Sequence, residues 1–224
     1  MKPKIFGIAI LFAFSTSVTS CNDNDDEVQI QEAATPFFNL KTGNKWVYKK
    51  YQNSESEPTV FTFSGITDNV EIVGEIVVNG LTFSKVHHTH RSIPQEAEYE
   101  YWRVNNLGHL IVLNIEEISQ DVTEEMGATF HPGTDIAYQS TITKDFFTIY
   151  YHVTPEINLI VEGKNYTVLP YKGDITPAGS PTGTVTKTVE YNFQKGIGLV
   201  KGVGHVVTGN YSWEDRLVSY DLVE

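Results

Sequence analysis

The chain is poor in cysteine: it has one, Cys21, among 224 residues. A single thiol excludes a disulfide framework within the chain, a cysteine-rich zinc site and a Cys-x-x-Cys redox site. Proline and glycine, with 9 and 17 residues, are also too few for a collagen-like or low-complexity protein. With 40% hydrophobic and 20% charged residues, the composition is that of an ordinary globular protein.

Basic residues are scarce as well. The chain has 16 Lys and Arg against 28 Asp and Glu, which gives a net charge of -12. Proteins that bind nucleic acid need clustered Lys and Arg to contact phosphates, so we exclude nucleic acid as a partner. The length allows one large domain or at most two small ones.

The sequence opens with an apolar run that is too short to span a membrane. Residues 5–14 are almost wholly apolar, whereas a membrane-spanning helix needs ~20 apolar residues. Lys2 and Lys4 precede this run, and small polar residues follow at 15–20. This order is typical of a secretory signal peptide, which we predict at residues 1–20 rather than a buried helix of the domain.

The only cysteine stands directly after this segment. Val18, Thr19, Ser20 and Cys21 resemble the lipobox of bacterial lipoproteins, an aliphatic residue and two small ones before Cys. The resemblance implies that Cys21 carries acyl chains such as palmitate and becomes the new N-terminus. Several acyl chains make a stable anchor, so we expect attachment to the outer membrane. An accidental free thiol after an ordinary cleavage site is the alternative.

Residues 21–35 form an acidic segment, which begins with Asn-Asp-Asn-Asp-Asp-Glu after the cysteine. A block of acids cannot pack, so we predict a flexible, solvated tether. Acidic residues at this place also resemble the surface-export signal of lipoproteins from the Bacteroidota, which implies exposure at the cell surface. A plain linker facing the periplasm is the alternative.

The remaining residues, 36–224, predict a single β domain. Val70, Ile72, Ile76 and Val78 would share one face of a strand while Glu71 falls on the other, which is the period of two that strands show. Turn residues at 79–80, 105–108 and 194–196 separate such runs and predict hairpins. The best helical candidate is the acidic segment 115–126, with one or two turns. We therefore expect an all-β fold of about ten to twelve antiparallel strands, a sandwich or an open, clamshell-like half-barrel.

Four phrases along this domain resemble a broad group of uncharacterised lipoproteins of the Bacteroidota. They are the opening Gly43-Asn44-Lys45-Trp46-Val47-Tyr48, the Asn79-Gly80 hairpin, the Tyr101-Trp102 strand with its Asn105-Asn106-Leu107-Gly108 turn, and the late Gly196-Ile197-Gly198-Leu199-Val200-Lys201. The resemblance implies a β-rich, curved-sheet carrier and supplies no catalytic residue. From the alternation alone, Trp46 and Tyr48 are expected in the core.

The most suggestive polar cluster is His87, His88 and His90. His88 and His90 fall on one face of a strand, as His-x-His metal ligands do, but zinc needs a third and preferably a fourth ligand. The candidates for that role are Glu96, Glu98, His109, His131, His152 and His205. A polar strand end without metal is the alternative that we favour, so no cofactor is predicted and His88 and His90 stay weak candidates.

We find no support for nucleophilic catalysis. The sequence has no Gly-x-Ser-x-Gly elbow. The adjacent acids Glu116-Glu117 and Glu124-Glu125 are typical of a solvated face rather than of an acid and base pair. We therefore predict a protein that is not an enzyme. A convergent set of titrating side chains deep in a cleft would contradict that prediction.

Aromatic residues leave one functional expectation. Trp102, Trp213 and several Tyr on a β scaffold would suit a sugar-stacking platform or a cavity for an acyl chain, although they would equally suit an ordinary core. Residues 145–153 are apolar on both faces, so we expect the ligand groove beside this strand. The main hypothesis is a lipid-anchored binding or accessory module. The alternatives are a structural or interaction protein of the envelope and a metal-dependent enzyme at His87–His90.

Overall fold

The computed structural model describes residues 36–54, 56–90, 98–115, 117–123, 126–181, 184–206 and 210–223. The predicted signal peptide, the lipidation site Cys21 and the tether at 21–35 lie outside the described residues. The chain divides into two compact units, of which Thr35–Glu224 is the larger. The structure below is that of this unit. Its described part holds no helix that is both long and apolar enough to cross a membrane.

Thirteen strands make up the described part of this unit. In chain order they are β1 (Lys45–Gln52), β2 (Thr62–Val78), β3 (Leu81–His88), β4 (Tyr99–Val104), β5 (Leu110–Leu113), β6 (Ala128–His131), β7 (Gln139–Lys144), β8 (Phe147–Val153), β9 (Ile157–Val161), β10 (Lys164–Pro177), β11 (Lys187–Gln194), β12 (Gly198–His205) and β13 (Ser212–Asp221).

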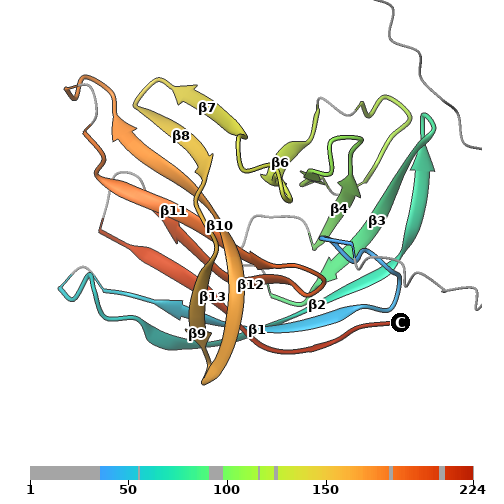
Figure 1. Cartoon of the computed structure of the whole chain (residues 1–224), viewed down its shortest axis with the longest axis horizontal. Coiled ribbons are helices and arrows are strands. Elements are labelled where there is room, and N and C mark those ends of the chain that lie inside the picture. Colours follow the sequence, from blue (N-terminus) through green and yellow to red (C-terminus); the bar gives the residue numbers. More distant parts are fainter. Residues whose placement is uncertain are drawn as a thin grey trace, which may run out of the picture. The chain divides into compact units, whose positions relative to one another are not determined.

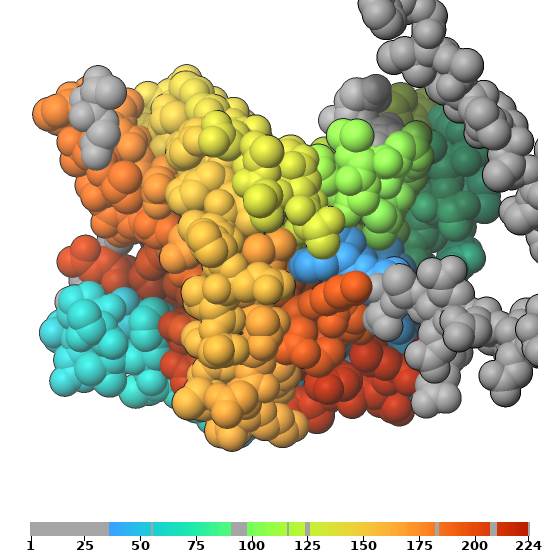
Figure 2. Space-filling view, in the orientation of Figure 1, coloured from blue at the N-terminus to red at the C-terminus, as the bar shows by residue number. Residues whose placement is uncertain are grey.

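All strand pairs are antiparallel and belong to one open sheet. The order across it is β6-β5-β4-β3-β2-β1-β13-β12-β11-β10-β8-β7, and β9 pairs with the first part of β10. The sheet is curled, so that its end strands β6 and β7 come to the same side (Figure 1). The space-filling surface is notched there, between the segments around β4 and β7 (Figure 2). This confirms the predicted all-β, open and curved fold, with slightly more strands than expected.

The predicted hairpins are confirmed. Asn79 and Gly80 join β2 to β3 with φ angles of 51° and 75°, the left-handed pair that a two-residue hairpin turn requires. Residues 105–108 connect β4 to β5, and residues 194–196 connect β11 to β12.

The predicted shared face of β2 is only partly correct. Val70 and Ile72 are buried on one face with Val86, but a register shift between Ile72 and Gly74 places Ile76 and Val78 on the other face, where Val78 packs with Phe83.

The predicted helix at 115–126 is wrong. Its described residues form turns and irregular segments, with Met126 in a 3₁₀ turn and without α-helix. Val122 is the apolar anchor of this segment, at 2% exposure, and packs with Phe83 and Tyr101. The amide of Asn79 donates a hydrogen bond to the Val122 carbonyl at 3.1 Å. A single buried valine fixes a loop, whereas a packed helix needs an apolar stripe of several residues.

Strand β1 connects to the other half of the sheet through its aromatic side chains. Trp46 is 3% exposed, and its indole N–H donates to the Ile197 carbonyl at 2.6 Å. The hydroxyl of Tyr48 donates to the Leu199 carbonyl at 2.9 Å. The expectation that these two side chains belong to the core is confirmed. Between Val47 and Tyr48 the pairing with β13 shifts, because Val218 is an extra residue on β13.

A second group of rings fills part of the space within the curl. We call it the aromatic plug; it comprises Phe37, Phe38, His131, Tyr171 and Phe193. His131 is fully buried, its Nε2 donates to the Leu169 carbonyl of β10 at 3.0 Å, and its Nδ1 accepts from the Gly133 N–H at 3.1 Å. An imidazole that donates with one nitrogen and accepts with the other is neutral. The plug thus joins the end strand β6 to β10 by a side chain rather than by backbone pairing.

Candidate functional site

A cavity of about 260 Å³ lies within the curl of the sheet. Its lining residues come from β6, from β4 to β1 and from β13 to β11, which together form an arc of the curled sheet. Its described lining consists of Tyr48, Lys50, Asp68, Val70, His88, Glu100, Trp102, Phe130, Tyr191, Leu199, Gly202, Val203, Gly204, Trp213 and Asp215. The lining therefore combines five aromatic rings with a group of ionisable side chains.

The aromatic part of the lining includes both tryptophans that the sequence singled out. Trp102 comes from β4 and Trp213 from β13, strands that are far apart in the sheet order. Phe130 and Tyr191 lie beside one another, with ring centroids 4.9 Å apart, and Phe130 also contacts Trp102 at 6.4 Å. The curl of the sheet brings these rings to one cavity.

The ionisable part of the lining forms a chain of contacts along neighbouring strands. We call it the ionic wall; it comprises Lys50, Asp68, His88, Glu100 and Asp215. The ammonium of Lys50 lies 2.9 Å from Asp215 Oδ1 and 3.7 Å from Asp68 Oδ2. Lys50 pairs directly opposite Asp215 across β1 and β13, so the strand register itself creates this ion pair.

His88 connects the two halves of the ionic wall. Its Nδ1 lies 3.0 Å from Asp68 Oδ2, and its Nε2 lies 3.4 Å from Glu100 Oε2. The second contact lacks hydrogen-bond geometry, since His88 Nε2 is buried without a hydrogen-bond partner. Glu100 Oε2 in turn accepts from the indole N–H of Trp102 at 2.7 Å. The wall is thus coupled to an aromatic ring of the cavity.

The pKa values in the wall follow from these contacts. Burial opposes the charged form of His88, but the hydrogen bond to Asp68 and the contacts with Glu100 outweigh it and raise the pKa of His88 above its usual range. Burial likewise opposes ionisation of Asp68, but His88, the backbone N–H of His90 and Lys50 lower the pKa of Asp68. The arrangement favours an imidazolium beside a carboxylate.

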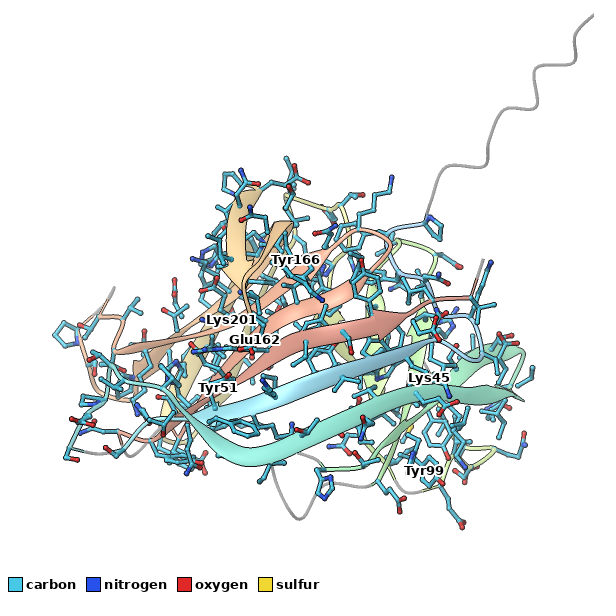
Figure 3. The ribbon with its side chains drawn as sticks, turned by 90° about the horizontal axis from the view of Figure 1, so that it is seen from below. Lys45, Tyr51, Tyr99, Glu162, Tyr166 and Lys201 are labelled. Carbon is cyan, nitrogen blue, oxygen red and sulfur yellow. The ribbon has the colours of Figure 1, made fainter. Side chains whose placement is uncertain are left out.

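The opposite side of the same strands carries a different set of charges. Glu162, in the turn between β9 and β10, lies 3.4 Å from the Lys49 ammonium and accepts from the Tyr51 hydroxyl at 2.8 Å. Glu214 is nearly buried between Lys201 at 2.7 Å and Arg216 at 2.6 Å. Figure 3 shows Tyr51, Glu162 and Lys201 grouped on the underside of the sheet. This outer network fastens the β9–β10 turn to the sheet and lines no described part of the cavity.

The structure separates the predicted histidine cluster. His88 faces the cavity, while His87 lies 2.7 Å from Glu98 at a half-buried position and the side chain of His90 is exposed. His90 contributes through its backbone N–H, which donates to Asp68 at 2.9 Å. Within the described ranges no group of three or more His, Cys, Asp or Glu side chains is placed to hold a metal. Glu96, one of the suggested ligands, lies outside the described residues.

The remaining suggested histidine ligands have other partners. His109 lies 3.3 Å from Asp135, His131 belongs to the aromatic plug, and His152 lies 3.9 Å from Asp174. His205 contacts Ser212 at 2.6 Å and the Thr188 carbonyl at 2.8 Å. Of the adjacent acids, only Glu117 is among the described residues.

The cavity does not lie beside residues 145–153, where the ligand groove was expected. None of these residues lines the cavity. The strand β8 has half-buried side chains on both faces, because Tyr151 stacks on Tyr171 at 5.2 Å while Tyr150 on the other face is 40% exposed. Apolar residues on both faces here reflect packing near the edge of the sheet rather than a ligand site.

Four residues of the ionic wall were missed by the sequence analysis: Lys50, Asp68, Glu100 and Asp215. Each stands at an inward position of its strand, where a charged residue interrupts the apolar face; Asp68 precedes Val70 at such a position. That interruption was the available signal. The wall is also a convergent set of titrating groups in a cavity, the arrangement that was expected to be absent from a protein without enzymatic activity.

Comparisons with known proteins give matches only at low similarity. No protein-family model and no curated protein matches the chain. A solved structure from Bacteroides fragilis, described as an exported protein with a YmcC-like fold, is 10% identical with a TM-score of 0.46, over 84% of this chain and 99% of its own. A structure described as a lipoprotein from Parabacteroides distasonis is 9% identical with a TM-score of 0.39, over 85% and 100%.

A third structure, a β-barrel-like protein of a domain of unknown function from Brucella abortus, is 10% identical with a TM-score of 0.33, over 85% of this chain and 100% of its own. These similarities are too low to assign a family or a function.

Proposed function

We propose that this protein is an outer-membrane lipoprotein, anchored through Cys21, that binds a small carbohydrate in the cavity of its curled sheet without transforming it. The charged, apolar and small-residue order of residues 1–20 and the lipobox at Cys21 support the anchor. The observation that carries the binding role is the convergence of Trp102, Trp213 and the ionic wall on one cavity.

The size and lining of the cavity favour a sugar over an acyl chain. Pockets for drug-sized ligands measure roughly 300–1,000 Å³, so about 260 Å³ suits a ligand of one or two rings. An acyl chain would cover the ionic wall without offering it hydrogen bonds, which is costly for buried polar groups. A sugar ring presents an apolar face to aromatic rings and hydroxyl groups to charged side chains.

Binding of this kind is tested with the full-length protein, by titration of tryptophan fluorescence and by calorimetry. The probes are neutral, acidic and amino oligosaccharides, with oleate as an acyl probe. Trp102→Ala should weaken binding at least tenfold, because it removes a ring of the cavity and the donor to Glu100. Phe146→Ala is the matched control, since Phe146 is 60% exposed outside the cavity and should leave binding unchanged. Equal effects of the two variants would contradict the assignment of the cavity.

Acid–base chemistry at His88 is the second candidate. The observation that favours it is the hydrogen bond that His88 Nδ1 donates to Asp68, which orients the imidazole as in many catalytic pairs. The binding role is preferred, because the described lining contains no Ser, Thr or Cys nucleophile and because His88 Nε2 is buried. Oligosaccharide products that form with the protein and disappear with His88→Gln would establish an enzyme instead.

The anchor has its own test. Cys21→Ser should leave the protein unlipidated in labelling with palmitate and should move it from the membrane fraction to the soluble fraction. A variant that still fractionates with membranes would contradict the lipid anchor. Protease treatment of intact cells distinguishes surface exposure from a periplasm-facing position. Capture of a stable envelope protein partner, together with an empty cavity, would favour the structural alternative.

A further inference from the structure

Trp213 lies flat against the backbone of the neighbouring strand. It pairs directly opposite Gly204 of β12, and a Cβ built on Gly204 would approach the Trp213 ring atoms Cε2 and Cζ2 to 2.3 Å. The φ angle of Gly204 is ordinary, so the backbone itself does not require glycine at this position. Glycine is needed here for steric reasons, because only the absence of a side chain lets the indole pack on the strand. Trp213 is only half-buried and lines the cavity, and its ring also contacts Tyr211 with centroids 6.3 Å apart, so part of the indole is accessible from the cavity.

The next inward position of β12 is also a glycine, and it lies opposite a charged residue instead of a ring. Gly202 pairs opposite Asp215, which pairs opposite Lys50 on its other side. A Cβ on Gly202 would meet only ordinary contacts, the nearest at 3.6 Å from Leu199. Glycine inside a strand weakens it and often marks the close approach of a ligand. Here Gly202 adds no side chain to the cavity wall beside the Lys50–Asp215 pair, about 7 Å along the strand from Trp213.

We propose that Lys50, Gly202, Gly204, Trp213 and Asp215 form a subsite, the Trp213 subsite, for one neutral sugar ring. The ring stacks on the accessible part of the Trp213 indole. Two of its adjacent hydroxyl groups reach the Lys50–Asp215 pair, one donating to the carboxylate and the other accepting from the ammonium. This inference rests on the proposed function and adds the class of sugar.

The charges of the subsite favour a neutral sugar over a charged one. The Lys50 ammonium and the Asp215 carboxylate are 2.9 Å apart, so any group that touches the pair meets both signs. Hydroxyl groups donate and accept, and therefore match both partners at once. A uronate carboxylate would face Asp215, and an amino sugar would face Lys50. Asp215 is the more accessible of the two side chains, at 23% exposure against 9%.

Gly204→Ala is the decisive variant, because the added Cβ displaces the indole from the strand without removing any polar contact. Gly74→Ala is the matched control: Gly74 also lies within a strand with an ordinary φ, and a Cβ there would meet nothing within 4 Å. We expect Gly204→Ala to weaken binding of neutral di- and trisaccharides at least tenfold by calorimetry and Gly74→Ala to leave it within twofold. Thermal unfolding of both variants shows whether each is folded.

Saturation-transfer NMR on the unmodified protein provides a second measurement that needs no variant. The carbon-bound protons on one face of the sugar should receive the largest transfer from the aromatic protons. Preference for oligogalacturonides or chitosan oligosaccharides, transfer spread evenly over the sugar, or equal affinity of Gly204→Ala and Gly74→Ala would overturn the subsite. Binding of oleate alone would overturn it while leaving a ligand cavity in place. Failure of every probe to bind would overturn the proposed function as well.

Discussion

His88 in the ionic wall and His131 in the aromatic plug are both withdrawn from solvent, yet their surroundings displace their pKa values in opposite directions. His88 lies between the carboxylates of Asp68 and Glu100, which raise its pKa despite burial. Burial among rings, with only backbone partners and the nearby charge of His109, lowers the pKa of His131 to about 4 despite the Leu169 carbonyl. The surroundings therefore favour the charged form of the side chain in one region and the neutral form in the other.

The difference separates charges that line a cavity from rings that pack against one another. The ionic wall keeps its charges next to the cavity, where the proposed ligand would contact them. The aromatic plug satisfies both nitrogens of His131 internally and surrounds them with rings, so neither nitrogen is available to a ligand. Strand β6 contributes to both the cavity and the plug, because Phe130 lines the cavity and His131 belongs to the plug.

The plug should give the largest loss of stability. His131→Ala removes a buried ring and leaves the Leu169 carbonyl and the Gly133 N–H without their partner. We expect the free energy of unfolding to fall by about 4 kcal/mol, measured by urea denaturation. His90→Ala is the control, since the exposed His90 side chain can be lost within about 0.5 kcal/mol. Similar losses in the two variants would remove the distinction between plug and surface.

The second prediction concerns the loss of stability at low pH. The folded-state pKa of His131, about 4, lies below its unfolded value of 6.5, so the unfolded chain binds the extra proton first as the pH falls. Stability that is present above pH 6.5 should therefore be lost between pH 6.5 and 4, by about 3 kcal/mol from this residue. His131→Gln should flatten this part of the profile of unfolding free energy against pH. A profile as steep as that of the unmodified protein would show that other groups cause it.

The stability that His88 contributes in the ionic wall should change with pH in the opposite direction to that of His131, and the change should be smaller. The folded-state pKa of His88 is raised, so its contribution is complete below pH 6.5 and is lost as the pH rises through the folded value. Asp68→Asn should cost about 2 kcal/mol at neutral pH, because it replaces a charged hydrogen-bond partner. NMR titration of the His88 ring should show its pKa falling in this variant. An unchanged pKa would mean that Asp68 does not set it.

The sequence predicted the fold where the signal is local. Asn79 and Gly80 define a hairpin by themselves, and the alternation around Val70 and Ile72 identifies a buried face without knowledge of the partner strands. The helix predicted at 115–126 was wrong, because the polar residues of this segment are compatible with either helix or loop. The packing of Val122 on β3 and β4 fixes the segment as a loop.

The site was less predictable, because it depends on pairing across the sheet. Trp102 and Trp213 were identified by residue type, but nothing local indicates that β4 and β13 meet at one cavity. Lys50 and Asp215 are 165 residues apart, and only the register of β1 with β13 brings them together. His131 was one isolated histidine among several, and its role follows entirely from the rings that surround it.

The extra residue on β13 decides which charges the two strands present to each other. If Val218 did not bulge, the pairing of Val47 with Ser219 would continue in step and place Lys50 opposite Arg216, two cations on one rung. The bulge shifts the register by one residue, so that Lys50 lies opposite Asp215 instead of Arg216. A single extra residue in β13 thus gives Lys50 an acidic partner on the cavity side of the sheet and moves the rung of two cations to Lys49 and Arg216 on the opposite side.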